Sequence, residues 1–330
     1  MRRAFIRRQL SRPLSNLPNT LRGACSPALL AALALVFNAL IWGVSWWPLR
    51  ALAQHGLHPL WATAIVFIFS LACLLCVRPH AWRGLSQTPW LWGLALASGL
   101  TNVGFNWAVT QGDVVRAVLL FYLMPVWVML LAWPLLGERP NQASLLRLAL
   151  ALMGLVLVLK TADSPWPVPE GLTDWLAIMG GFCFALTNIL LRKLHHTPEP
   201  TRILAMFAGG VIAATAAAVV GLGLGVLTAP PAPTTAWVLI AVLLSLAFLA
   251  GNLALQYGAA RLSASTTSLI MLTEVLFASA SAVLLGAGEL TAHTLGGGAL
   301  ILLAALWSSL GAGQRKPSDG LTVQNESSGK

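Results

Sequence analysis

One carboxylate lies deep inside an apolar stretch of the sequence. Glu274 sits within SLIMLTEVLFASASAV, whereas the other acidic residues fall in polar segments, tails or the ends of apolar runs. A charge at the centre of a membrane helix costs at least about 2.5–3.5 kcal/mol, so such a residue faces a polar cavity or is protonated. We therefore expect Glu274 to bind an amine or to take up a coupled proton. The alternative is a carboxyl group that is hydrogen-bonded for purely structural reasons.

Two pairs of amide side chains recur at helical spacing. Asn102 and Asn106 are four residues apart, as are Asn252 and Gln256, so each pair occupies one helix face. Facing a cavity, these amides would hydrogen-bond a zwitterion. Facing a neighbouring helix, they would clamp it with about 0.6–2 kcal/mol per bond. The sequence leaves both open, and Asn188 has the same two interpretations, with helix packing favoured.

A single arginine begins the fourth apolar run. Arg116 follows Asp113 by three residues. One interpretation is a cation that binds a substrate carboxylate. The other, which we favour, is a side chain whose stem lies along lipid while its charged head reaches the membrane interface.

Aromatic residues lie deep in the first, third and fourth apolar runs. Rings gathered there would form a pocket wall with a cation–π surface for an ammonium group, and the alternative is packed or lipid-facing bulk. These residues are Trp42, Trp46, Trp107, Trp127 and Tyr122.

Proline and glutamate residues are expected to shape the helices. Pro125 removes a backbone hydrogen bond in the middle of the fourth run and should kink it, either to bend a gate or to shape packing. Glu138 and Glu289 follow long apolar runs, and each would cap the helix that comes next, because a helix N-terminus favours negative charge.

The sequence gives little support for a metal site, a redox centre or an enzyme active site. Cys73 and Cys76 form C-x-x-C inside an apolar run, where the motif lacks its redox context. His195-His196 lies in a polar loop, and only His293 approaches an apolar run. A membrane-embedded enzyme would need a nucleophile with a base, paired aspartates or metal ligands. We expect no cofactor, no metal and no enzyme activity.

The composition is that of a membrane protein. Hydrophobic residues make up 57% of the chain and charged residues 9%, against roughly 25% charged in soluble domains. Runs of about 20 apolar residues span a bilayer as helices. The sequence predicts ten spans, at 28–49, 60–77, 90–110, 114–135, 143–160, 174–191, 203–227, 236–257, 264–286 and 294–312.

The basic residues predict an orientation. With both termini in the cytoplasm, 17 of the 20 Lys and Arg lie on the cytoplasmic side and three lie outside: Arg50, Arg116 and Lys160. Cytoplasmic loops are enriched in Lys and Arg, so this orientation is preferred, in a bacterial-type inner membrane. The net charge of +10 is thus interpreted as contact with anionic lipid and not with nucleic acid.

The chain is duplicated. Residues 42–50 (WGVSWWPLR) resemble residues 184–192 (FALTNILLR), and the Gly-Glu pairs at 137–138 and 288–289 lie 151 positions apart. Five spans per half is an odd number, so the halves are inverted, as in many secondary transporters. We divide the chain into a basic cytoplasmic tail (1–26), two five-helix repeats (27–161 and 172–312) and a disordered tail (313–330).

These halves resemble the EamA family of the drug/metabolite transporter superfamily. Members carry L-x-P-V and then a leucine-rich stretch with G-E, here Leu123–Val126 and Leu135–Glu138. Glu274 matches the family's glutamate in the ninth helix, but Val275 stands where proline is common, so the geometry of that helix stays open. The stretch at 121–125 is similar to the branch that includes aromatic amino-acid exporters.

The resemblance implies a ten-helix, all-α inner-membrane transporter that works by alternating access. We expect export of a small-molecule substrate, an amino acid or a related compound, with proton coupling at Glu274 as a hypothesis. The alternatives are a drug or cation carrier and a nucleotide-sugar carrier of the same superfamily. A nucleotide would require several basic residues in the cavity, and only Arg116 is available. The sequence specifies no oligomeric state.

Overall fold

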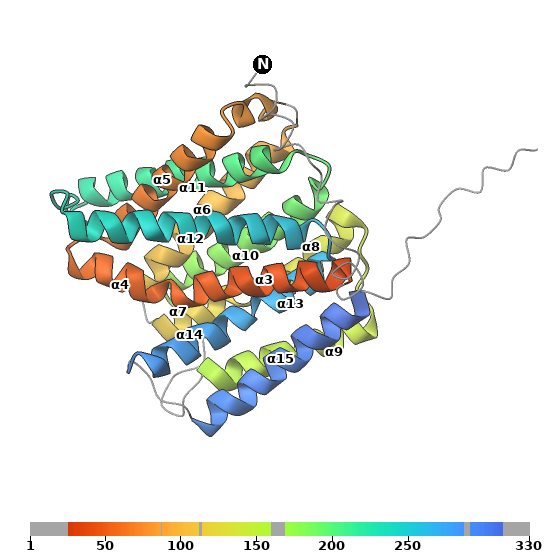
Figure 1. Cartoon of the computed structure of the whole chain (residues 1–330). Coiled ribbons are helices and arrows are strands. Elements are labelled where there is room, and N and C mark those ends of the chain that lie inside the picture. Colours follow the sequence, from red (N-terminus) through yellow and green to blue (C-terminus); the bar gives the residue numbers. More distant parts are fainter. Residues whose placement is uncertain (1–25, 87, 112–113, 160–168, 287–290, 313–330) are drawn as a thin grey trace, which may run out of the picture.

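The computed structural model describes residues 26–86, 88–111, 114–159, 169–286 and 291–312, and these are helical with short connections (Figure 1). The first half contains α3 (Pro27–Val44), α4 (Trp46–Gln54), α5 (Pro59–Val77), the 3₁₀ turn η2 (Ala81–Gly84), α6 (Trp90–Gln111), α7 (Val114–Phe121), α8 (Met124–Leu136) and α9 (Gln142–Leu159). The second half contains α10 (Leu172–Lys193), α11 (Glu199–Gly223), α12 (Thr235–Ala259), α13 (Ala264–Met271), α14 (Thr273–Leu284) and α15 (Ala292–Ala312).

Every predicted span corresponds to a helix or to a pair of consecutive helices. Within the described ranges, nine of these are long and apolar enough to cross a membrane. The tenth span is α6, whose mean hydropathy is lowered by polar residues such as Thr101, Asn102 and Asn106. The polar residues of α6 therefore have a reason other than lipid contact to lie inside the bundle.

The boundaries of two predicted spans were wrong. The first span runs on to Gln54 instead of ending near residue 49. The seventh covers Glu199–Gly223 instead of 203–227, because Pro200 is tolerated in the first turn of a helix. Beyond the C-terminal end of this helix the chain turns at Gly225, whose φ is +71°.

Three spans are broken in the middle, two of them by proline. A proline ring clashes with the carbonyl of the residue four positions earlier. Accordingly α3 ends at Val44, four residues before Pro48, and α7 ends at Phe121, four residues before Pro125. The break between α13 and α14 falls at Leu272 without any proline. There, the hydroxyl of Thr273 donates to the carbonyl of Ile270 at 2.7 Å.

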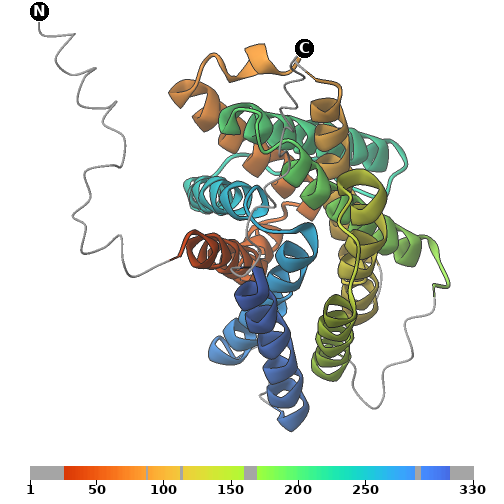
Figure 2. The ribbon, with the colours of Figure 1, turned by 90° about the vertical axis from the view of Figure 1, so that its right-hand side faces the viewer.

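The two halves are related by a pseudo-twofold exchange of their helices. In the first half α6 packs against α10 and α11, and in the second half α12 packs correspondingly against α3 and α5. The pair α9 and α15 and the pair α5 and α11 lie on opposite sides of the bundle (Figure 1). The start of α3 and the end of α15 lie at the same end of the bundle (Figures 1 and 2), which we call the terminal end. The structure is thus an all-α membrane fold of two inverted five-helix repeats.

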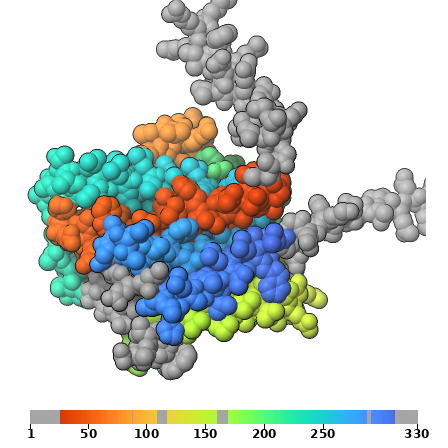
Figure 3. All heavy atoms as spheres, turned by 60° about the horizontal axis from the view of Figure 1, so that its bottom comes forward, coloured from red at the N-terminus to blue at the C-terminus, as the bar shows by residue number. Residues whose placement is uncertain are grey.

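The outer surface of the bundle is apolar. Large side chains such as Leu96, Leu130, Leu243 and Leu303 are about 60% exposed, at 64%, 60%, 58% and 58%. Figure 3 shows α3, α14 and α15 lying side by side along one face. Soluble monomers rarely expose contiguous apolar patches of this extent. The surface is suited to lipid tails.

Glycines allow several helices to approach within backbone contact. A Cβ on Gly209 of α11 would overlap the backbone carbonyl of Ala95 in α6. On Gly43 of α3 it would lie 2.6 Å from the carbonyl oxygen of Glu274. Small residues at helix interfaces are the main device for tight packing in membranes, where no hydrophobic force joins the helices.

We expect Gly209→Ala to destabilise the protein and Gly223→Ala, in the same helix, to leave it unchanged. Overpacking costs about 1–3 kcal/mol, so thermal unfolding in detergent should shift down by at least about 3 °C. A Cβ on Gly223 meets nothing within 4 Å, which makes it a matched control. Equal unfolding temperatures for the two variants would contradict the close contact between α6 and α11.

Candidate functional site

A cavity lies at the centre of the bundle, between the two halves. Its volume is about 70 Å³, which holds a few water molecules but is far below the roughly 300–1,000 Å³ of drug-sized ligand sites. The helices that contribute to it are α3, α5, α6, α7, α10, α11, α12 and α14. Its lining residues are Trp42, Phe67, Ser98, Thr101, Asn102, Phe105, Phe121, Phe184, Thr187, Met206, Phe207, Phe248, Asn252, Leu255 and Glu274.

Among the described residues that line this cavity, Glu274 is the one with a charged side chain. It lies in the first turn of α14, directly after the break at Leu272. A half-helix N-terminus inside a membrane carries partial positive charge and favours a carboxylate. The side chain of Tyr122, which is buried at the break between α7 and α8, hydrogen-bonds to the carboxyl group of Glu274. The two broken spans thus meet at this carboxyl group.

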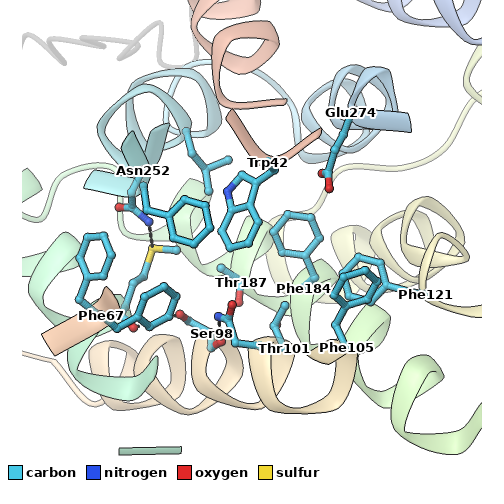
Figure 4. A pocket seen from close by; sticks show the side chains of 15 residues that line it. Trp42, Phe67, Ser98, Thr101, Phe105, Phe121, Phe184, Thr187, Asn252 and Glu274 are labelled. Atoms are coloured by element: carbon cyan, nitrogen blue, oxygen red, sulfur yellow. Dashed lines mark hydrogen bonds between the residues drawn. The ribbon is translucent and has the colours of Figure 1, made fainter. Parts of the chain in front are cut away.

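Aromatic rings form about half of the cavity wall. Trp42 stacks on Phe248 with centroids 4.4 Å apart and an interplanar angle of 21°. Phe121 contacts Phe105 at 4.6 Å and Phe184 at 5.8 Å. The labelled side chains in Figure 4 surround the cavity, with Trp42 between Asn252 and Glu274 in this view. Such walls bind apolar groups and present ring faces to a cation.

Amide and hydroxyl groups complete the lining. Asn102 donates its amide N–H to the carbonyl of Ser98 at 2.9 Å, within its own helix. The Nδ2 of Asn252 lies 3.6 Å from the sulfur of Met206. The Oδ1 of Asn252 and the hydroxyl of Thr187 are buried and have no protein partner. Buried polar groups of this kind require a hydrogen bond from water or a ligand. The Oδ1 of Asn252 and the hydroxyl of Thr187 can therefore hydrogen-bond a molecule in the cavity.

Several predicted site residues lie outside the cavity wall. Asn106 hydrogen-bonds to Thr63 of α5. Gln256 donates to the Met206 sulfur at 3.0 Å. The indole N–H of Trp46 donates to Ser281 of α14 at 2.9 Å. These three residues join helices, which is the structural alternative for such side chains.

The remaining predicted residues take different places. Tyr122 lies behind the wall, in contact with Glu274. Pro125 lies in the first turn of α8, immediately after the break. Asn188 is buried beside the lining residue Thr187. The backbone of Arg116 belongs to α7, but its side chain lies outside the described residues, as does Glu289.

A layer of buried polar groups separates the cavity from the terminal end. Asn38 of α3, Asn188 of α10, Gln256 of α12 and Thr267 of α13 each have at least one side-chain atom without a protein partner. Each residue lies on the terminal-end side of the nearest cavity residue of its span. Unpaired buried polar atoms are rare in native structures and call for a specific reason. Access of water along this route would satisfy them.

Glu138 was predicted to cap α9, the helix that follows it, and this prediction was wrong. At the start of α9 the side chain of Asn141 accepts the N–H of Ser144 at 2.8 Å. The Oε2 of Glu138 accepts the N–H of Ala264 at 3.2 Å, at the start of α13, and its Oε1 lies 3.8 Å from the Nε of Arg192. Glu138 therefore crosses from the first half to the second, because the pseudo-twofold brings α8 against α13.

Sequence reasoning missed most of the aromatic wall. Six phenylalanines line the cavity, yet phenylalanine is common on lipid-facing and core positions alike, so residue type alone does not single them out. The available signal was their position: Phe105 lies three residues from Asn102, on the polar face of α6. Conversely, Trp107 packs with Leu60 and Leu227, and Trp127 against Phe182.

The fold and the cavity define a multi-pass α-helical membrane protein with a central site between inverted repeats. Residues 29–160 match the model of the EamA-like transporter family. This match covers the first of the two repeats and agrees with the resemblance to the EamA family.

Curated relatives are similar to a little under half of this chain, and a solved structure is similar to most of it. An uncharacterized transporter of Archaeoglobus fulgidus is 30% identical over 142 residues, which cover 42% of this chain and 50% of that protein. The protein RarD of Streptomyces exfoliatus is 28% identical over 166 residues, covering 47% of this chain and 49% of the relative. The match therefore spans about half the length of these curated relatives. A solved crystal structure has a TM-score of 0.69 at 18% identity, over 86% of this chain and 97% of that one, which shows a shared fold.

We expect cysteine labelling to separate the two asparagines of α6. In a variant lacking all four native cysteines, Asn102→Cys should react with a small membrane-permeant thiol reagent faster than Asn106→Cys. Residue 102 lines the cavity, whereas residue 106 is engaged with Thr63 of α5, and thiol reactivity follows access. Faster labelling at residue 106 would contradict the assigned cavity wall.

Proposed function

We propose that this protein is a secondary transporter that carries a small organic compound with a protonated amine across the inner membrane, in the direction of export. The observation that supports it is the charge of the central cavity. Among its lining residues there is one carboxylate, Glu274, and there is no Lys, Arg or His. Aromatic rings and a lone carboxylate together form the recognition chemistry of an organic cation.

The charge balance favours an amine over an anionic substrate. A carboxylate or phosphate entering this cavity would meet Glu274 with like charge in a low-dielectric site, where repulsion is strong. An ammonium group would instead form a charge-assisted hydrogen bond with it. A nucleotide-sugar carrier has no support here, because the described lining offers no cation for the phosphates.

Amino acids remain the second candidate, because they carry both an amine and a carboxylate. Asn102 and Asn252 both line the cavity, and an amide N–H can donate to a substrate carboxylate. For this, Asn102 would have to release the carbonyl of Ser98. An aromatic amino acid would also match the ring-lined wall, in agreement with the resemblance to aromatic amino-acid exporters.

Transport requires this compact cavity to open. A volume of about 70 Å³ is too small for an amino acid or a drug-sized cation, so the halves must move apart to admit one. The breaks at Ser45, at Tyr122–Leu123 and at Leu272 are natural hinge points near the site. The polar layer of Asn38, Asn188, Gln256 and Thr267 supports an opening toward the terminal end, which we place in the cytoplasm.

Glu274 also supports proton coupling. A carboxyl group that is isolated from water and cations carries either a proton or a cationic partner. Binding of the amine would release the proton, and return of the empty carrier would require a proton again. One residue would thereby exchange substrate for proton across the membrane.

We expect Glu274→Gln to abolish amine counterflow in proteoliposomes. Removing one partner of a desolvated charge pair costs about 2–5 kcal/mol, which corresponds to a loss of at least about 30-fold. Glu199→Gln is the matched control, because Glu199 begins α11 away from the cavity. The assay would use labelled aromatic amines, amino acids and organic cations, with and without a pH gradient. Wild-type rates for Glu274→Gln would rule out the proposed role of Glu274, and no counterflow of any compound by the wild type would rule out the carrier.

We expect Tyr122→Phe to weaken substrate affinity while leaving the fold intact. The ring stays in its buried position, but the hydrogen bond to Glu274 is lost. A hydrogen bond to a charged group contributes about 1.5–3 kcal/mol, so KM for the amine should rise about tenfold or more. Tyr257→Phe is the control, since the other tyrosine lies beside Arg261 at the terminal end. A rise in KM that is equal in both variants would show that Tyr122 does not position Glu274.

A further inference from the structure

A second cavity, larger and more polar than the first, lies at the terminal end of the bundle. Its volume is about 290 Å³. The connection from α8 to α9, the end of α10, the connection from α12 to α13, and α15 all contribute to it. Both halves of the chain therefore form its wall.

The wall of this cavity is strongly basic. It contains Arg139, Arg147, Arg192 and Arg261 but one carboxylate, that of Glu138, so its formal charge is +3. Glu138 is already engaged with Arg192 and with the N–H of Ala264. A basic pocket between transmembrane helices attracts phosphate-bearing headgroups.

The guanidinium groups of Arg192 and Arg261 are each held by contacts that use only some of their N–H donors. Arg192 donates one N–H to the carbonyl of Ala260 at 2.7 Å. Arg261 donates to the carbonyl of Tyr257 at 2.9 Å and lies 3.6 Å from the centre of the Tyr257 ring. Each guanidinium has five N–H donors in a rigid fork, so these anchors fix its position and leave further N–H groups for a ligand.

Hydroxyl groups lie beside these arginines in the same wall: Ser144, Ser263, Ser265 and Ser308. Ser263 and Ser308 donate to Thr266, and Arg147 donates to Ser144 and Ser308. The N-terminus of α13 is already occupied by the carboxylate of Glu138, which accepts the N–H of Ala264. Two exposed tryptophans, Trp133 and Trp307, lie beside Arg139 and Arg147 respectively. Tryptophan is enriched at the level of lipid headgroups.

We propose that this cavity binds a phosphate group. Arginine forks match the oxygens of a phosphate in a bidentate manner, and the hydroxyls of Ser144 and Ser265 in the same wall add neutral donors. The phosphate comes from an anionic lipid headgroup or from a free phosphate compound. Because Arg139 and Arg147 belong to the first half and Arg192 and Arg261 to the second, a bound phosphate bridges the two halves and stabilises this arrangement. The site is distinct from the central cavity and does not depend on the proposed substrate.

The test is a titration of the purified full-length protein followed by native mass spectrometry. Phosphatidylglycerol, an anionic phosphodiester, is compared with zwitterionic phosphatidylcholine of the same chain length. Inorganic phosphate is added as a competitor in a second series. The variant is Arg147→Gln with Arg261→Gln, and the matched control is Arg78→Gln with Arg83→Gln, two arginines at the same end that do not line the cavity.

We expect the parent protein and the control to prefer phosphatidylglycerol, and the double variant to bind it about 30-fold more weakly, given about 1 kcal/mol per arginine. If inorganic phosphate competes with the lipid, free phosphate is a source of the bound group. If inorganic phosphate does not compete, the source is the lipid headgroup. Equal affinity in the double variant and the parent would overturn the proposal, as would a parent that neither prefers phosphatidylglycerol nor binds phosphate. Should the glutamine variant fail to fold, Arg147→Lys with Arg261→Lys takes its place. This pair keeps the charge but loses the fork, and undiminished binding in it would likewise count against a bidentate phosphate site.

Discussion

The structure depends on keeping one carboxyl group out of contact with lipid. In the hydrocarbon region an unpartnered charge is costly, so Glu274 requires both a polar partner and a cavity. Tyr122 provides the first and the space between the two halves provides the second. Both depend on broken spans, because the breaks at Tyr122–Leu123 and at Leu272 bring these side chains to the centre of the bundle. The inverted repeat explains why the two breaks meet.

The sequence predicted the architecture well because membranes restrict it so strongly. Backbone groups in lipid must pair within a helix, so apolar runs and odd repeats were enough to place the spans and invert the halves. Glu274 was also predicted, since a lone carboxylate in an apolar run is conspicuous. The aromatic wall was not, because a phenylalanine facing lipid and one facing the cavity are alike in sequence. The break at Leu272 was left open by the sequence, because Val275 stands where proline is common, and at this break the hydroxyl of Thr273 donates to the carbonyl of Ile270.

The first half contributes different contacts at its centre and at the terminal end. Near its centre, Asn102 and Trp42 contribute to the cavity. At the terminal end, Glu138 crosses to the start of α13 and pairs with Arg192. This contact ties the halves together where the polar layer lies. In the proposed opening toward that end the Glu138 contacts would break, and water that reaches the buried amides and hydroxyls would offset their loss.

The central claim is that Glu274 holds either a proton or an amine. The most direct measurement is proton release on substrate binding, recorded with a pH indicator in weakly buffered detergent solution. We expect the solution to acidify when wild-type protein is saturated with a transported amine. With Glu274→Gln and the same amine we expect no acidification. Binding of the amine to the wild type without proton release would contradict the exchange at this carboxyl group.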